Sequence, residues 1–241
     1  MGLDIYVGSF TRYYAHQWET VIQKAAREQG VPVVTVLRQP ESPDAIKDPA
    51  VINTGVLQWR DVMLQGLRAT GSHVTELAWD ERVETPYFTD KPGWDCFGAL
   101  LILASHEQAV VPIFSSRYPK RLPDNWPKDF RLQGATAAGG RYSHLLGCEV
   151  WLPVDFPDPF EGPKPNAQAS RFGSSIRLQQ QLVELNERTY HGSASDLTAW
   201  RETVPEPADR TFDPMAKTGL AITIALVESA NKNRLPMVLD Y

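Results

Sequence analysis

Two short stretches of this chain combine residue types that could bind a ligand or a partner. The first is the turn at residues 8–12, whose polar members are Ser9, Thr11 and Arg12. In open α/β sheets ligands gather beyond the carboxyl ends of strands, where helix N–H groups favour an anion. These three side chains could therefore hold an anion. In the alternative interpretation, Ser9 and Thr11 cap a helix and Arg12 lies in solvent.

The second stretch, residues 87–95, places aromatic rings beside carboxylates. Its candidate binding residues are Tyr87, Asp90, Trp94 and Asp95. Aromatic rings supply contact area at a modest entropic cost, and carboxylates pair with cations or accept sugar hydroxyls. We expect a loop that leads into a helix and forms a recognition surface. In the alternative, Trp94 packs in the core and Asp90 or Asp95 caps the helix.

No motif that would fix a reaction accompanies these stretches. Residues 134–141 begin like a phosphate loop, but Gly140 and Arg141 stand where Lys and Ser or Thr are required. The sequence lacks GxGxxG and GxSxG, and no histidine has a second ligand at metal-binding spacing. We therefore expect no metal and no cofactor.

Composition narrows the classes of function. The 241 residues carry a net charge of −5, which argues against a nucleic-acid backbone as partner. Cys96 and Cys148 are the only cysteines, so we expect two buried thiols in a reducing compartment. Signal-peptide features are absent, and no apolar run approaches the roughly 18 residues of a membrane span. These features favour a cytoplasmic protein that does not enter the membrane.

Hydrophobic patterning predicts a single mixed α/β domain over residues 1–241. Residues 3–7 alternate as a strand, residues 11–29 have helical spacing with Gly30 as a stop, and residues 31–37 form a second strand. This order predicts a parallel βαβ unit. We expect about five strands and about five helices in all.

The remainder of the chain gives further helices and one irregular region. Helices are predicted at 48–67, 94–107, 175–190, 195–203 and from Asp213, with the apolar segment 219–227 at the centre of the fold. Strands are predicted at 110–114, 148–154 and 235–240. Residues 115–170 are rich in proline and loops, either as a surface excursion or as a seam between two subdomains.

Three stretches together resemble a known group of sequences. They are MGLDIYVGSFTRYY, TPYFTDKPGWDCFGALLI and SSIRLQQQLVELNERTYHG. The chain resembles uncharacterised bacterial soluble proteins that open with MGLDIYVG, to which no activity is attached. The resemblance implies a bacterial cytoplasmic protein and carries over no site residue.

Two functions remain open. The first is a binding or inhibitor protein, for instance a bacterial immunity protein that neutralises a toxin through acidic and aromatic loop residues. The second is a metal-independent hydrolase of a sugar or nucleoside-like substrate that uses Asp4, Asp90 and Asp95 as convergent carboxylates. A protein partner is expected in the first case and a small-molecule ligand in the second. The absence of a catalytic motif favours the first.

Overall fold

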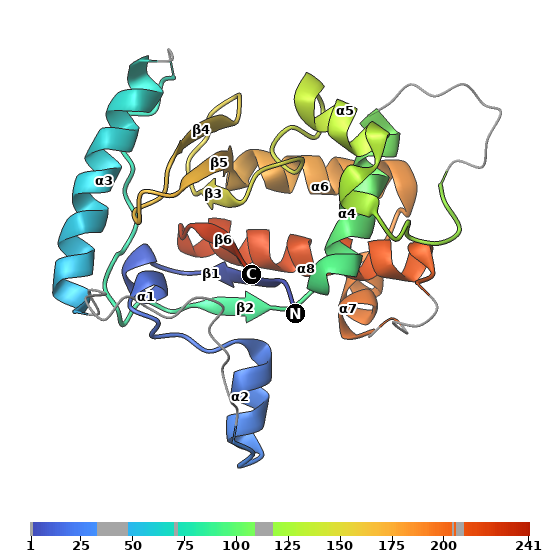
Figure 1. Cartoon of the computed structure of the whole chain (residues 1–241), viewed down its shortest axis with the longest axis horizontal. Coiled ribbons are helices and arrows are strands. Elements are labelled where there is room, and N and C mark those ends of the chain that lie inside the picture. Colours follow the sequence, from blue (N-terminus) through green and yellow to red (C-terminus); the bar gives the residue numbers. More distant parts are fainter. Residues whose placement is uncertain (1, 33–47, 70–71, 109–117, 204, 206–209) are drawn as a thin grey trace.

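Six strands form one mixed sheet in the computed structural model, which describes residues 2–32, 48–69, 72–108, 118–203, 205 and 210–241. The strand order is β2-β1-β6-β3-β5-β4 (Figure 1). The strands are β1 (Asp4–Val7), β2 (Phe88–Asp90), β3 (Val150–Leu152), β4 (Phe160–Pro163), β5 (Ala169–Ser174) and β6 (Met237–Asp240). The mixed α/β fold predicted from the sequence is confirmed.

Eight α-helices accompany the sheet in the described part of the chain. They are α1 (Phe10–Tyr14), α2 (Val21–Glu28), α3 (Pro49–Ala69), α4 (Gly93–Gln108), α5 (Phe130–Ala138), α6 (Ser175–Thr189), α7 (Ala194–Glu202) and α8 (Phe212–Asn233). A short 3-10 helix, η1 (Trp126–Lys128), precedes α5. The predicted helices at 48–67, 94–107, 175–190 and 195–203 correspond to α3, α4, α6 and α7.

The two faces of the sheet carry different helices. Leu3, Ile5 and Val7 belong to the core formed with α4, α6 and α8. On the opposite face, Val238 and Phe172 pack against α1 and α3 through Phe10, Trp59 and Met63. Figure 1 shows α3 beside one end of the sheet and α4 beside the other. Asp4 and Tyr6 therefore lie on the α1 side.

Helix α8 lies at the centre of the helical layer. It contacts α4, α6 and α7, and nearly all of residues 219–227 are buried, as predicted. Gly219 allows the close approach to α4, because a Cβ atom at this position would overlap the backbone carbonyl of Cys96.

The predicted N-terminal βαβ unit is wrong. Both edges of β1 are occupied by antiparallel partners, β2 and β6, so β1 has no free edge for a parallel neighbour. The parallel pair is β3 with β5, and the connection between them contains the strand β4. Residues 33–37, most of the expected second strand, lie outside the described residues.

The single helix predicted at residues 11–29 is also wrong, because the chain forms two helices there. α1 ends before His16, which has a left-handed φ of 52°, and Thr20 starts α2 with a capping box. Gly30 follows α2 with φ 68°, as a helix stop requires.

The proline-rich region contains more regular structure than the sequence indicated. Residues 134–138 lie in α5 and Gly139 is its C-cap, so this stretch is not a phosphate loop. η1, α5, β3 and β4 all fall within residues 115–170, whereas the strand predicted at 110–114 lies outside the described residues. Among the helices that the structure describes, none has the length and apolarity needed to cross a membrane.

Candidate functional site

The turn after β1 is held by Ser9. Its hydroxyl caps α1 by accepting the Arg12 N–H at 3.2 Å, and it donates to the carbonyl of Arg82 at 3.3 Å. Tyr6 donates its hydroxyl proton to the carbonyl of Ser9 at 3.0 Å. The capping role expected for Ser9 is confirmed, whereas Thr11 lies inside the helix.

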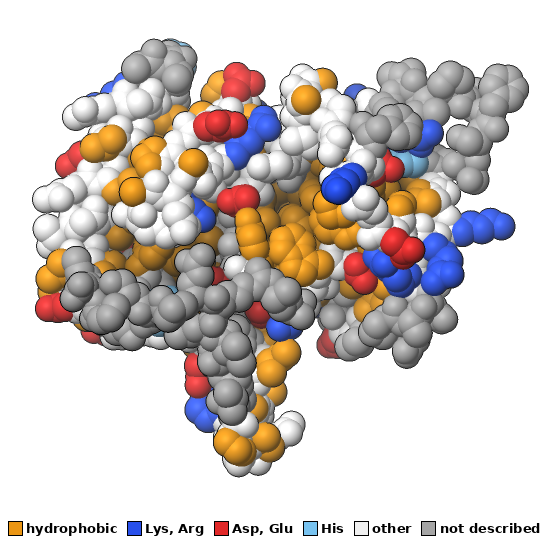
Figure 2. Space-filling view, viewed as in Figure 1, with side chains coloured by type: hydrophobic (Ala, Val, Ile, Leu, Met, Phe, Trp, Pro, Cys, Tyr) orange, Lys and Arg blue, Asp and Glu red, His pale blue; other side chains and the backbone are white. Residues whose placement is uncertain are grey.

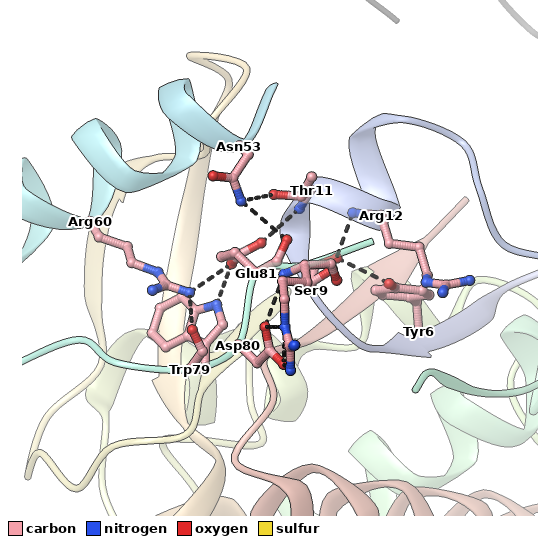
Figure 3. Close-up of polar contacts among 10 residues, drawn as sticks. Tyr6, Ser9, Thr11, Arg12, Asn53, Arg60, Trp79, Asp80 and Glu81 are labelled. Carbon is pink, nitrogen blue, oxygen red and sulfur yellow. Dashed lines mark hydrogen bonds and ion pairs between the residues drawn. The ribbon is translucent and has the colours of Figure 1, made fainter. Parts of the chain in front are cut away.

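A carboxylate of the protein itself occupies the position where an anion was expected. The Thr11 N–H donates to Glu81 Oε2 at 2.8 Å (Figure 3). Glu81 Oε1 accepts hydrogen bonds from Arg60 Nη2 at 3.0 Å and from the indole of Trp79. Since Ser9 and Thr11 are buried and the Thr11 N–H already donates to Glu81, a ligand at this N–H would have to displace Glu81.

The Arg60–Glu81 ion pair is buried between α3 and the segment before β2. Only 3% of the Glu81 side chain is exposed. Burial lowers the pKa of Arg60, and the nearby Glu81 carboxylate opposes this change. The Arg60 guanidinium also lies 4.0 Å from the ring centre of Trp79 and donates to the Trp79 carbonyl. Asn53 completes the network by donating to Thr11 and to the Glu81 carbonyl (Figure 3).

Arg12 connects the two stretches that the sequence analysis singled out. Its guanidinium lies 4.8 Å from the ring centre of Tyr87, and Nη1 donates to the carbonyl of Gln17 at 2.9 Å. The Tyr87 hydroxyl accepts the Glu19 N–H at 3.2 Å. Arg12 and Tyr87, which are far apart in the sequence, therefore form one surface.

Two further aromatic residues extend this surface. Tyr6 is fully buried, and its ring lies 5.2 Å from Tyr13, 5.0 Å from Trp18 and 6.2 Å from Tyr87. Tyr13 and Trp18 stack at 5.8 Å. We call the partly exposed residues Arg12, Tyr13, Trp18 and Tyr87 the aromatic patch.

The rest of the second stretch lies in β2 and α4, so the expectation that residues 87–95 form one loop is wrong. Asp90 belongs to β2, where it pairs in register with Ile5 on the α8 side of the sheet, and it forms an ion pair with Arg201 at 2.7 Å. Trp94 and Asp95 lie in the first turn of α4.

The first turn of α4 holds its two candidate residues in separate contacts. Asp95 pairs with Arg210 at 3.0 Å. The Trp94 ring lies 5.0 Å from that of Tyr241 and 6.3 Å from that of Trp126. Trp94 therefore packs against other rings, and Asp95 is held by a basic partner.

Two of the carboxylates considered for hydrolysis, Asp4 and Asp90, lie on opposite faces of the sheet. Asp4 lies on the α1 side of the sheet, opposite Asp240 in the register, and pairs with Lys91 at 3.3 Å. Burial raises the pKa of Asp4, and its Oδ1 makes no hydrogen bond within the described residues. Because Asp90 lies on the other face, the structure offers no paired-carboxylate geometry for Asp4 with Asp90.

One buried histidine was not identified as important from the sequence. His144 accepts the Ser174 N–H through Nδ1 at 2.9 Å and donates through Nε2 to the carbonyl of Pro157 at 2.9 Å. This pairing requires the neutral imidazole. Burial lowers the pKa of His144.

We expect His144 to make the protein less stable below about pH 6.5. The folded-state pKa lies below the unfolded value of about 6.5, so the unfolded chain takes up the proton first. The free energy of unfolding should therefore fall as the pH decreases from 6.5 towards the folded pKa, with a slope of up to about 1.4 kcal/mol per pH unit. Urea unfolding at several pH values measures this slope. In His144→Gln this contribution should disappear, and parallel curves for the two proteins would contradict the prediction.

The two thiols are buried, as the sequence predicts. Cys96 and Cys148 are unpaired and buried, and burial raises their pKa values to about 11 and about 12. Within the described ranges, no group of three or more His, Cys, Asp or Glu side chains could hold a metal ion.

The structure thus brings Arg12 and Tyr87 together, buries Ser9 and Thr11, and places Asp90, Trp94 and Asp95 at other surfaces. Sequence reasoning missed Tyr13 and Trp18 as members of the same surface, and it missed Glu81 as the anion at the helix start. No protein-family model, curated protein or solved structure matches this chain.

Proposed function

We propose that this protein binds and inhibits another protein, and that the aromatic patch is the contact surface. The observation that carries the proposal is the stacking of Arg12 on Tyr87 beside Tyr13 and Trp18. Tyrosine, tryptophan and arginine dominate the few residues that supply most of the binding energy in protein interfaces. A partly exposed cluster of all three types supports recognition.

The patch is supported by a rigid base. The buried Tyr6 contacts three of the aromatic rings, and the buried Arg60–Glu81 pair fixes α1 against α3. A surface held in this way loses little conformational entropy when a partner binds. Rigidity therefore favours tight binding without rearrangement.

Helix α2 extends the same surface. Tyr87 and Thr89 both hydrogen-bond to the backbone of Glu19, which immediately precedes the Thr20 cap. α2 projects from the body of the protein (Figure 1), and none of its residues is buried. Val21 and Ile22 are 40% and 52% exposed, and Figure 2 shows apolar side chains on this projection. An exposed apolar helix face is one that a partner groove can accept.

Charge and cysteine usage support a bacterial immunity protein as the specific form of this function. The net charge of −5 would attract a basic partner and speed its association, for example an enzyme toxin that binds nucleic acid. The two unpaired, buried thiols suit a reducing cytoplasm. In this proposal the protein would bind and inhibit the toxin inside the cell that produces the toxin.

Substitutions in the patch test the proposal directly. Arg12→Ala and Tyr87→Ala should each weaken binding at least tenfold, about 1.4 kcal/mol, because they remove large side chains from the centre of the contact. Partner proteins captured from a bacterial lysate by the tagged wild type would be identified by mass spectrometry. Calorimetric titration of the purified partner then gives the affinities, and an activity assay of the partner tests inhibition.

Val183→Ala is the matched control. Val183 is an exposed apolar residue, 43% accessible, on α6 at the opposite face of the sheet. This variant should bind as the wild type does. Normal binding by both patch variants, or loss of binding only in Val183→Ala, would contradict the proposed surface. A bound partner that keeps full activity would contradict inhibition while leaving binding intact.

A further inference from the structure

Tyr14 of α1 and the first half of α3 line a concave surface. It is a cavity of about 730 Å³ between the first half of α3, Tyr14 and the connection from β4 to β5. This volume falls within the range of about 300–1,000 Å³ that is usual for small-molecule sites. Tyr14 follows Tyr13 directly in α1, so neighbouring residues serve the cavity and the patch.

Those residues lining the cavity that the structure describes are uncharged and mainly apolar. Ile52 and Val56 supply aliphatic surface from α3, while Gln58 and Asn166 supply amide groups. All the described residues that line the cavity are neutral. A charged ligand would lose its hydration without gaining a counter-charge, which is costly. The lining therefore favours an uncharged ligand.

Tyr14 provides a polar group that the protein does not use. Its ring packs against Phe10 and Tyr13, but its hydroxyl makes no hydrogen bond with any described residue. The Thr54 hydroxyl, by contrast, donates to the carbonyl of Ala50 at 3.0 Å. A ligand carbonyl could accept the Tyr14 proton and satisfy the hydroxyl.

Gly55 is a solvent-exposed residue in the lining of the cavity. It stands in the interior of α3, where glycine costs roughly 0.5–1 kcal/mol relative to alanine. A Cβ atom at Gly55 would have no neighbour within 4 Å, so no close contact with the described protein accounts for this glycine. The missing side chain instead leaves space in the wall of the cavity.

We infer that this cavity binds a small, uncharged, mainly apolar molecule that carries one hydrogen-bonding group, such as a ketone or amide carbonyl. The neutral side chains of the described lining residues and the unused Tyr14 hydroxyl point to this class of ligand, and the open space at Gly55 leaves room for it. This site is separate from the aromatic patch and does not depend on the function proposed for it.

The inference can be tested with two fluorescent probes that share a naphthalene ring. PRODAN is uncharged and carries one ketone, whereas ANS carries a sulfonate. Titration of the wild-type protein with PRODAN should show saturable binding with one site per chain, and ANS should bind at least tenfold more weakly. Gly55→Leu fills the cavity from a position with free space and should weaken PRODAN binding at least tenfold.

Two further variants separate the cavity from other apolar surfaces. Gly55→Ala adds one methyl group and should keep the PRODAN affinity within about threefold of the wild type. Tyr14→Phe removes only the hydroxyl and should weaken PRODAN binding about threefold to tenfold, the usual net effect of one hydrogen bond. Circular dichroism and thermal melts should show that all three variants remain folded.

Several results would overturn the inference. They are the absence of saturable PRODAN binding, equal PRODAN affinity in the wild type and in folded Gly55→Leu, and binding of ANS as tight as that of PRODAN. If Gly55→Leu loses a protein partner while the wild type binds no probe, the cavity belongs to a protein interface instead.

Discussion

Replacing Glu81 by alanine is expected to lower the free energy of unfolding by about 3–5 kcal/mol, the usual effect of removing one partner of a buried ion pair. The substitution leaves the Arg60 guanidinium without its counter-charge in a buried site. It also leaves the Thr11 N–H and the Trp79 indole without their acceptor. Urea unfolding at neutral pH, followed by tryptophan fluorescence, measures the loss.

Two variants separate the charge from the hydrogen bonds. Glu81→Gln keeps the shape of the side chain and one of its two acceptor oxygens, so it should lose less stability than Glu81→Ala. The double variant Arg60→Met/Glu81→Leu removes both charges and should recover at least half of the loss, because no unpaired charge remains buried. A loss below about 1 kcal/mol for Glu81→Ala would show that the pair contributes no more than an exposed one.

Gly219→Ala is expected to destabilise the protein by about 3 kcal/mol, the upper end of the range for overpacked cores. The new Cβ atom would overlap the backbone carbonyl of Cys96 on α4, and backbone atoms cannot rotate away as a flexible side chain can. α8 and α4 would have to separate, although both helices are largely buried. Thermal or urea unfolding of the purified variant measures the effect.

Gly55→Ala is the matched control, because it makes the same substitution in another helix interior. The space around Gly55 is open, so the variant should gain roughly 0.5–1 kcal/mol from the higher helix propensity of alanine. The same chemical change should therefore have opposite signs at the two positions. Equal effects at Gly55 and Gly219 would show that the packing of α8 on α4 does not determine the outcome.

The sequence predicts those elements whose signals are local. The period of two at residues 3–7 identifies β1, although both faces of this strand are buried. A serine at position 174 or 175 marks the start of α6, and Ser174 forms the cap. The apolar segment 219–227 identifies the central helix because it has no polar face. In each case the sequence pattern that predicts the element lies within the element itself or at its first residue.

Features that depend on distant partners could not be predicted. Glu81 is separated from Thr11 by seventy positions, and the acidic residues beside Trp79 carry no local sign that one of them points inward. The register of β2 on β1 directs Asp90 to one face while Arg12 and Tyr87 meet on the other. Sequence spacing suggested one loop there, because it contains no information about register.

The position of β1 and β6 side by side in the sheet has a consequence for synthesis of the chain. β1 forms near position 4 and β6 near position 240, and each lies in the interior of the strand order. A ribosome therefore delivers β1 long before its neighbour β6, and pairing over such a separation is slow. Until residues 237–240 emerge, β1 and β3 each present an open edge that can pair with another nascent chain. Chains that lack residues 237–240 should therefore tend to pair with one another, whereas a chain that contains β6 can close its own sheet.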